Sequence, residues 1–246
     1  MANPTVVSHK DIAKDMKQPD AFQAVASKVA GWLVARKKQV LVAGAAIVAL
    51  LVITAVGLAI QASRSASAGK AMGALLETVA APVVAAPPAG FAGRTFPDET
   101  ARFKAIVEEA APVIGRYGGT DVGALAYQVR GDAHFGLKEW DAAAKDYQQF
   151  LGSVSKDDNL RFAALEGLAL VAESKGDVPG ALAAYERLAK EAPRFADRAD
   201  LERARVLAAS GKVPEAKELL TKFAANHKDS SLTGDATQRL AQLEAK

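Results

Sequence analysis

The sequence has no cysteine, few aromatic residues and few β-branched runs outside one segment. Without cysteine, its 246 residues cannot form disulfides, thiolate nucleophiles or cysteine-based metal sites. Aromatic residues make up 6% of the chain, whereas alanine, the strongest helix former, is abundant. This composition predicts an all-α protein.

Motifs for catalysis are also missing, since the sequence holds no HExxH, GxSxG, GxGxxG or phosphate-binding loop. Its three histidines, His9, His134 and His227, are distant from one another in the chain. We expect His134 to pack or face solvent rather than to bind a metal. The sequence therefore predicts no enzyme, no cofactor, no metal site and no small-molecule substrate.

The formal net charge of +3 is unevenly distributed. Residues 1–39 carry seven Lys/Arg and three Asp/Glu, a net of +4, whereas residues from Pro97 onward carry 21 and 24, a net of −3. The basic character thus belongs to the N-terminal tail and not to a folded surface. Nucleic acid is excluded as a partner, because phosphate binding needs cations clustered on a folded face.

One long apolar segment, Val40 to Ile60, runs for 21 residues without a charge. At 1.5 Å of rise per residue it makes about 31 Å of helix, enough to cross a bilayer core of roughly 30 Å. We therefore expect a transmembrane helix over 39–61.

The charges flanking this segment predict its orientation. Arg36, Lys37 and Lys38 directly precede it, whereas only Arg64 and Lys70 follow closely. Because positive residues stay cytoplasmic, we expect the N-terminus in the cytoplasm and the C-terminal domain in the periplasm or cell envelope, at a bacterial inner membrane. A cleaved signal peptide, with 66–68 (Ala-Ser-Ala) as its cleavage motif, is the alternative, but its apolar region would be unusually long.

The basic tail, 1–38, contains a second helical pattern. From Asp20, a suitable N-cap, Phe22, Val25 and Val29 recur at helical spacing toward Trp32. This stripe beside Lys and Arg fits an amphipathic helix at the cytoplasmic membrane interface. The alternative is that it extends the membrane helix into the cytoplasm.

Beyond the span, three regions are predicted. Residues 62–81 stay helix-compatible, and residues 82–97 are rich in Pro, Ala and Gly and indicate a semi-extended linker or loop. Residues 98–246 form a helical domain, in which Asp98 caps the first helix and Gly118 ends it.

Within that domain the sequence repeats. Gly176 and Ala181 recur 35 residues later as Gly211 and Ala216, and Ala143 precedes Ala181 by 38 residues. Periods of this length are typical of stacked helical hairpins. The small alanines let the two helices of each hairpin approach closely, larger residues fill the gaps to the next hairpin, and residues 230–246 close the stack as an amphipathic helix.

The repeated residues resemble the tetratricopeptide repeat, which implies an α-solenoid. Arg130 departs from the pattern, because the family usually has an apolar residue before the glycine. The residues that carry the resemblance in the two clearer copies are Tyr127, Gly131, Trp140, Ala143 and Tyr147, then Gly176, Asp177, Ala181, Tyr185 and Pro193.

A basic tail, one span and a small extracytoplasmic repeat domain together resemble the YfgM family. That resemblance implies an ancillary subunit of the bacterial Sec translocon that works beside a membrane-anchored periplasmic chaperone, and with the missing catalytic motifs it predicts a scaffold that binds protein partners. An alternative is a structural repeat protein of envelope assembly or cell division, for which the linker 82–97 would supply reach.

By resemblance, a partner would bind along the first helices of the repeats. The alternative is that these residues form only a solvated face. The candidate groove residues are Gln128, Asp132, Phe135, Glu166, Leu170, Glu173, Leu201 and Arg205.

Overall fold

The structure is a computed structural model that describes residues 30, 32–86, 90–156 and 158–245. Within these ranges the chain is helical and forms no strand, which confirms the predicted all-α fold. The chain divides into two units, 1–64 and 65–246, each described by itself below. Phe22, Val25 and Val29, on which the predicted tail helix depends, lie outside the described residues.

The described helix of the first unit is the N-terminal part of α3 (Lys37–Ala80). Its large apolar side chains are exposed, and Ile53 is 68% and Leu58 66% accessible. The most polar residue of the apolar segment, Thr54, donates its hydroxyl to the carbonyl of Leu50 at 2.5 Å. A helix with these properties satisfies its own backbone and hydroxyl groups, as hydrocarbon surroundings require.

The C-terminal part of α3 belongs to the second unit, so the helices predicted over 39–61 and 62–81 are one continuous helix. Met72 and Leu75 are buried in one apolar cluster with Ile106 and Ala110 of α4 (Glu99–Tyr117). Asp98 caps α4 as predicted, its carboxylate accepting a hydrogen bond from the amide of Ala101 at 2.7 Å.

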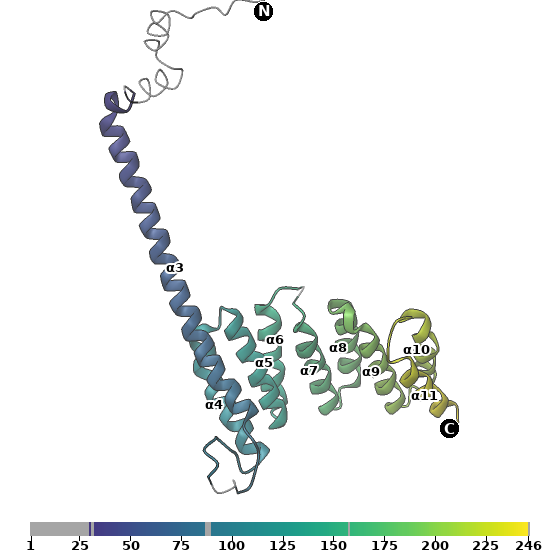
Figure 1. The fold of residues 1–246 in the computed structure, drawn as a ribbon. Coiled ribbons are helices and arrows are strands. Elements are labelled where there is room, and N and C mark those ends of the chain that lie inside the picture. Colours follow the sequence, from purple (N-terminus) through teal and green to yellow (C-terminus); the bar gives the residue numbers. More distant parts are fainter. Residues whose placement is uncertain (1–29, 31, 87–89, 157, 246) are drawn as a thin grey trace, which may run out of the picture. The chain divides into compact units, whose positions relative to one another are not determined.

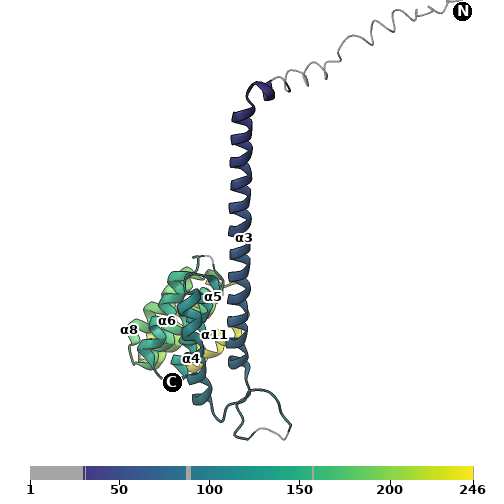
Figure 2. The ribbon, with the colours of Figure 1, turned by 90° about the vertical axis from the view of Figure 1, so that its left-hand side faces the viewer.

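Residues 81–97 connect the ends of α3 and α4 as a loop whose two ends are paired (Figure 1, Figure 2). The amide of Val84 donates to the carbonyl of Phe96 at 2.8 Å, and the amide of Phe96 donates to Pro82 at 3.0 Å. Arg94 donates to the buried hydroxyl of Thr78 at 2.7 Å and forms an ion pair with Glu109. A linker or loop was predicted over 82–97, and these contacts hold its two described ends together.

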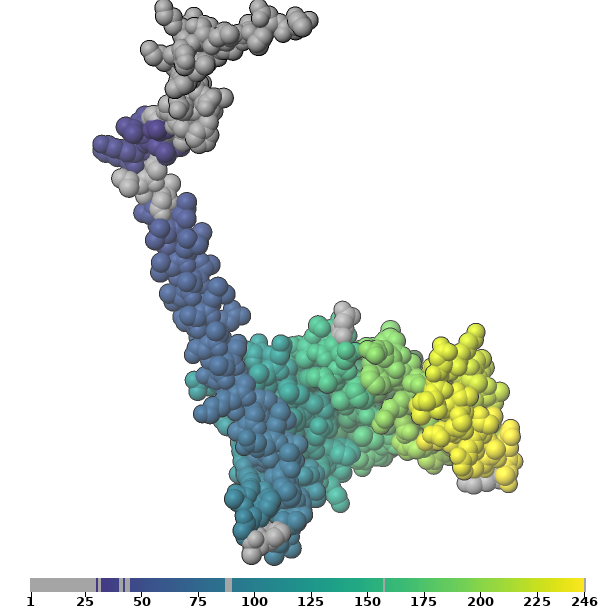
Figure 3. Space-filling view, viewed as in Figure 1, coloured from purple at the N-terminus to yellow at the C-terminus, as the bar shows by residue number. Residues whose placement is uncertain are grey.

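After α4, paired helices stand side by side in chain order and form one continuous body (Figure 1, Figure 3). Each hairpin consists of a first and a second helix, and a final helix covers the last hairpin. The elements are α5 (Asp121–Gly136), α6 (Trp140–Ser153), α7 (Arg161–Ser174), α8 (Val178–Glu191), η1 (Pro193–Phe195), α9 (Ala196–Ala209), α10 (Val213–Asn226) and α11 (Thr233–Glu244).

The small residues of the repeat are fully buried between the helices, as predicted. Ala143, Ala181 and Ala216 are all 0% exposed, one in each second helix. The ring of Tyr147 packs against two glycines, because a Cβ at Gly131 or Gly167 would lie 2.8 Å or 2.6 Å from it. Neighbouring helices therefore pack closely because the large tyrosine ring fills the space left by glycines that have no side chain.

The turn between the helices of each hairpin needs a left-handed residue. Gly176 and Gly211 adopt φ of 72° and 82°, directly after the C-caps of α7 and α9. The equivalent position in the first copy, 38 residues before Gly176, is Lys138, with φ of 62°. A side chain in this region of φ costs about 1–2 kcal/mol, so the first hairpin carries local strain that the other two lack.

Lys138→Gly should therefore raise the free energy of unfolding of the repeat domain by about 1 kcal/mol. Thermal denaturation of the detergent-solubilised chain, followed by circular dichroism, measures this. The matched control is Lys145→Gly in the middle of α6, which should lower stability by about 1 kcal/mol because it places glycine in a helix interior. A destabilised Lys138→Gly variant would contradict the strain at this turn.

Candidate functional site

The candidate groove residues lie on the first helices, and the repeat offsets arrange them in rows. Adding 38 and then 35 to residue 128 gives 166 and 201, and to residue 132 gives 170 and 205. A third row pairs residue 135 with residue 173. The row between the other two, which we call the middle row, consists of Asp132 of α5, Leu170 of α7 and Arg205 of α9. We call the surface made by these three helices the first-helix face.

The candidate groove residues differ in how far their side chains are exposed to solvent. Asp132 and Leu170 are exposed, Leu170 at 37%, whereas Gln128 is 8% and Leu201 only 3% accessible. Leu201 packs with Phe223 in the core beneath α11, so it cannot contact a partner. The remaining candidates are half-buried, namely Phe135, Glu166, Glu173 and Arg205.

Ion pairs join α7 to α9 along this face. Arg198 donates to Glu166 at 2.7 Å, and Arg205 donates to both oxygens of Glu173 at 2.7 and 2.8 Å. Arg205 also pairs with Glu202 at 2.5 Å. Each arginine of the two pairs is therefore neutralised from within the chain.

Two tyrosines of the second helices reach the first-helix face, which the repeat pattern alone did not indicate. Tyr147 donates its hydroxyl to Asp132 at 2.9 Å, and Tyr185 donates to Glu173 at 2.8 Å. Burial, and then the neighbouring carboxylate, raise the pKa of Tyr147 above its ordinary value. Burial and the hydrogen bond to Glu173 do the same to the pKa of Tyr185. Both hydroxyls therefore stay protonated and act as fixed donors that orient the carboxylates.

Asp132 has a different environment from the other carboxylates of the face. Desolvation by the surrounding protein raises its pKa, and the hydrogen bonds from Tyr147 and Gln128 only partly oppose this. The side chain is nevertheless exposed.

Residues 129–194 match the family model described as the tetratricopeptide repeat. This part of the chain contains tetratricopeptide repeats. No curated protein matches the sequence. Among solved structures, the chain is similar to a Podosopora anserina putative kinesin light chain with nearly identical TPR-like repeats and to a substituted form of that protein, each at 17% identity and a TM-score of 0.48, covering 59% of this chain and 79% and 78% of those chains.

Tetratricopeptide repeats are a protein-interaction fold, and the departure of this chain at Arg130 is explained by a specific contact. Arg130, in place of an apolar residue, donates to both oxygens of the buried Asp146 at 2.7 and 2.6 Å. His134 lies between acids, 2.5 Å from Glu139 and 3.7 Å from Asp146. A buried carboxylate with two donors is satisfied, so this cluster joins α5 to α6.

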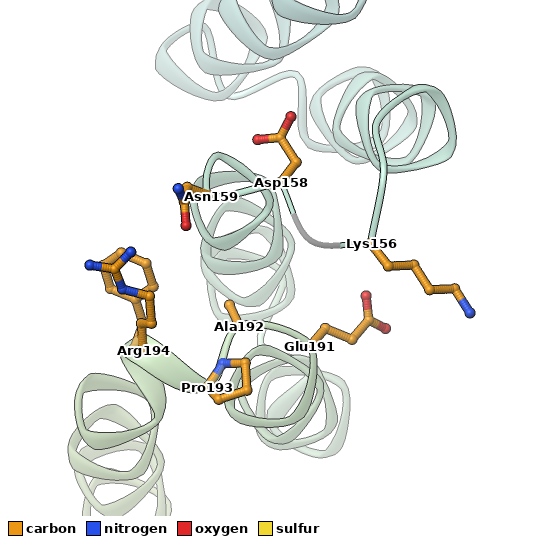
Figure 4. A pocket seen from close by; sticks show the side chains of 8 residues that line it. Lys156, Asp158, Asn159, Glu191, Ala192, Pro193 and Arg194 are labelled. Carbon is orange, nitrogen blue, oxygen red and sulfur yellow. The ribbon is translucent and has the colours of Figure 1, made fainter. Parts of the chain in front are cut away.

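A cavity of about 200 Å³ lies at one edge of the tetratricopeptide stack, between the α6–α7 loop and the end of α8 (Figure 4). Its Glu191 is held by Arg187 and Arg161, and hydrogen bonds from these arginines lower the pKa of that carboxylate. The lining mixes two cations with two carboxylates, and no step of acid–base or nucleophilic catalysis follows from it. Its residues are Lys156, Asp158, Asn159, Glu191, Ala192, Pro193, Arg194 and Phe195.

The paired carboxylates predict a measurable contribution to stability. Glu173→Gln should lower the free energy of unfolding by about 1 kcal/mol, because it weakens bonds from both Arg205 and Tyr185. Urea denaturation of the full chain in detergent checks this. Glu218→Gln, which breaks an exposed pair with Lys222 on α10, is the matched control and should leave the midpoint unchanged. Equal effects would contradict the inter-helix role of Glu173.

Proposed function

We propose that the chain is a bitopic inner-membrane scaffold whose first-helix face binds protein partners outside the cytoplasm. The observation that carries this proposal is the middle row of that face. Of its exposed members, Asp132 is held by hydrogen bonds from Tyr147 and Gln128. The other, Leu170, lies on α7 between Glu166 and Glu173, which are fixed by ion pairs. A surface whose side chains are preordered loses little conformational entropy when a partner binds.

The membrane part of the proposal rests on α3. Within Ala45–Ala80, an 18-residue window has a mean hydropathy of 2.4, and none of that window is buried in the structure. Arg36, Lys37 and Lys38 precede the apolar segment, so the cytoplasm is the expected location of the N-terminus.

Reporter fusions test this orientation directly. A cytoplasm-active reporter inserted after His9 and a periplasm-active reporter after Lys246 should both be active, because the basic flank holds the N-terminal side inside. Removing the flank with Arg36→Gln, Lys37→Gln and Lys38→Gln should weaken the asymmetry. A cytoplasm-active signal from the fusion after Lys246 would contradict the orientation.

For the partner, the resemblance to the YfgM family points to the Sec translocon and a membrane-anchored periplasmic chaperone. The alternative in envelope assembly or cell division relied on a linker with reach. The pairing of Val84 with Phe96 and of Arg94 with Glu109 holds the ends of that linker together, which favours the translocon version of the proposal.

Crosslinking and affinity purification from native membranes should recover translocon and chaperone components with the wild-type chain. Leu170→Asp should reduce that recovery several-fold, because it places a charge on the apolar part of the face. The matched control is Leu160→Asp, at a leucine 49% exposed just before α7 begins, which should retain the partners. Recovery of neither component would contradict these partners, and equal recovery by both variants would contradict the face.

A further inference from the structure

Asp132 is an unneutralised charge on the first-helix face. Glu166 and Glu173, the other acidic candidates, each pair with an arginine of α9. Across the described part of the chain, no Lys, Arg or His nitrogen lies within ion-pair distance of Asp132. The face therefore presents one free negative charge and no free positive charge among the candidate residues.

The hydrogen bonds of Asp132 leave one of its oxygens open. Tyr147 and Gln128 donate at 2.9 and 3.1 Å, and both bonds end on Oδ1. None of the hydrogen bonds found among the described residues reaches Oδ2. The carboxylate is thus held in place from one side and offers its second oxygen to a donor.

A second acceptor beside Asp132 also lacks a donor. Gln128 is only 8% accessible, and its amide nitrogen points to Asp132, which fixes the orientation of the amide group. Its Oε1 is enclosed and has no hydrogen-bond partner within the described ranges. A buried acceptor that lacks a donor is destabilising, so a cationic donor that reaches this oxygen forms a hydrogen bond that the free protein lacks.

The desolvation of Asp132 also favours a cationic ligand. Desolvation raises the pKa of this carboxyl, which means that the ionised form is destabilised where it stands. A lysine or arginine placed against it offsets that cost and forms a charge-assisted hydrogen bond. A carboxylate ligand would instead be repelled, and Arg198 and Arg205 are already neutralised.

The neighbouring position of the middle row is apolar. Leu170 is the equivalent of Asp132 in the next first helix, and α5 and α7 are in contact. Packed helices lie about 8–10 Å apart, so the free carboxylate and the exposed leucine are separated by roughly that distance. Arg205 completes the row as a cation that Glu173 and Glu202 neutralise.

We propose that the partner is a polypeptide segment with a lysine or arginine that pairs with Asp132 and an apolar side chain, about 10 Å away, that packs on Leu170. This inference rests on the proposed function, since it names the chemistry of the segment that the first-helix face binds. It excludes recognition of a segment's C-terminal carboxylate at this row, because both nearby arginines are occupied.

Selection from a random peptide library, displayed on phage, tests the inference with the full chain in lipid nanodiscs. The wild type should enrich peptides that combine a basic and an apolar residue. Asp132→Asn should lose the preference for the basic residue and keep the apolar one. Asp132→Lys should reverse the preference toward acidic residues.

One enriched peptide then serves as a defined probe. Replacing its basic residue with glutamine should weaken its binding to the wild type roughly tenfold and leave its binding to Asp132→Asn unchanged. Glu186→Gln removes an exposed carboxylate of α8 and is the matched control, which should behave as the wild type does. Melting curves of each variant confirm that the fold is intact.

The outcomes separate the two proposals. Peptides that require Leu170 but show no basic preference, or whose basic residue contributes equally with Asp132→Asn, would overturn the inference and leave the proposed function standing. Enrichment of no peptide above empty nanodiscs would overturn both.

Discussion

The ring of Tyr147 lies between Gly131 of α5 and Gly167 of α7, and a Cβ atom at either glycine would come within 3 Å of it. The hydroxyl at the end of this ring donates a hydrogen bond to Asp132 on the first-helix face. One side chain therefore sets the spacing of two hairpins and also orients an exposed charge of the face. The second copy repeats the bond to the face with Tyr185 and Glu173, whereas the third has Leu220 and no hydroxyl.

Much of the fold could be predicted because its causes are local or periodic. The 35- and 38-residue offsets locate the alanines at the helix crossings, and Asp98 is a cap by its position alone. The closure of the predicted linker or loop could not be predicted, because it depends on residues distant in the sequence. Arg94 meets Thr78 and Glu109 only when α3 and α4 already lie together.

The candidate site was predictable to the level of a helix face but not of individual contacts. The offsets place Glu166, Glu173 and Arg205 on the first helices, but they do not show that these residues neutralise one another or face Arg198. They also placed Leu201 on the face, although the neighbouring α11 covers it. Which ion pairs form depends on side-chain rotamers, and whether Leu201 is buried depends on the final helix. Neither follows from the repeat period of the sequence.

The three copies place different residues in the middle row, and this difference makes the two ends of the row chemically distinct. A solenoid of identical repeats would accept the same segment displaced by one repeat, and it would have no chemical means to distinguish one end of its face from the other. Here the row runs from an open acid, Asp132, through an apolar residue, Leu170, to a neutralised base, Arg205. If a segment binds along this row as proposed, its basic residue lies at the α5 end and its apolar residue lies at α7, so the two ends of the segment are not interchangeable.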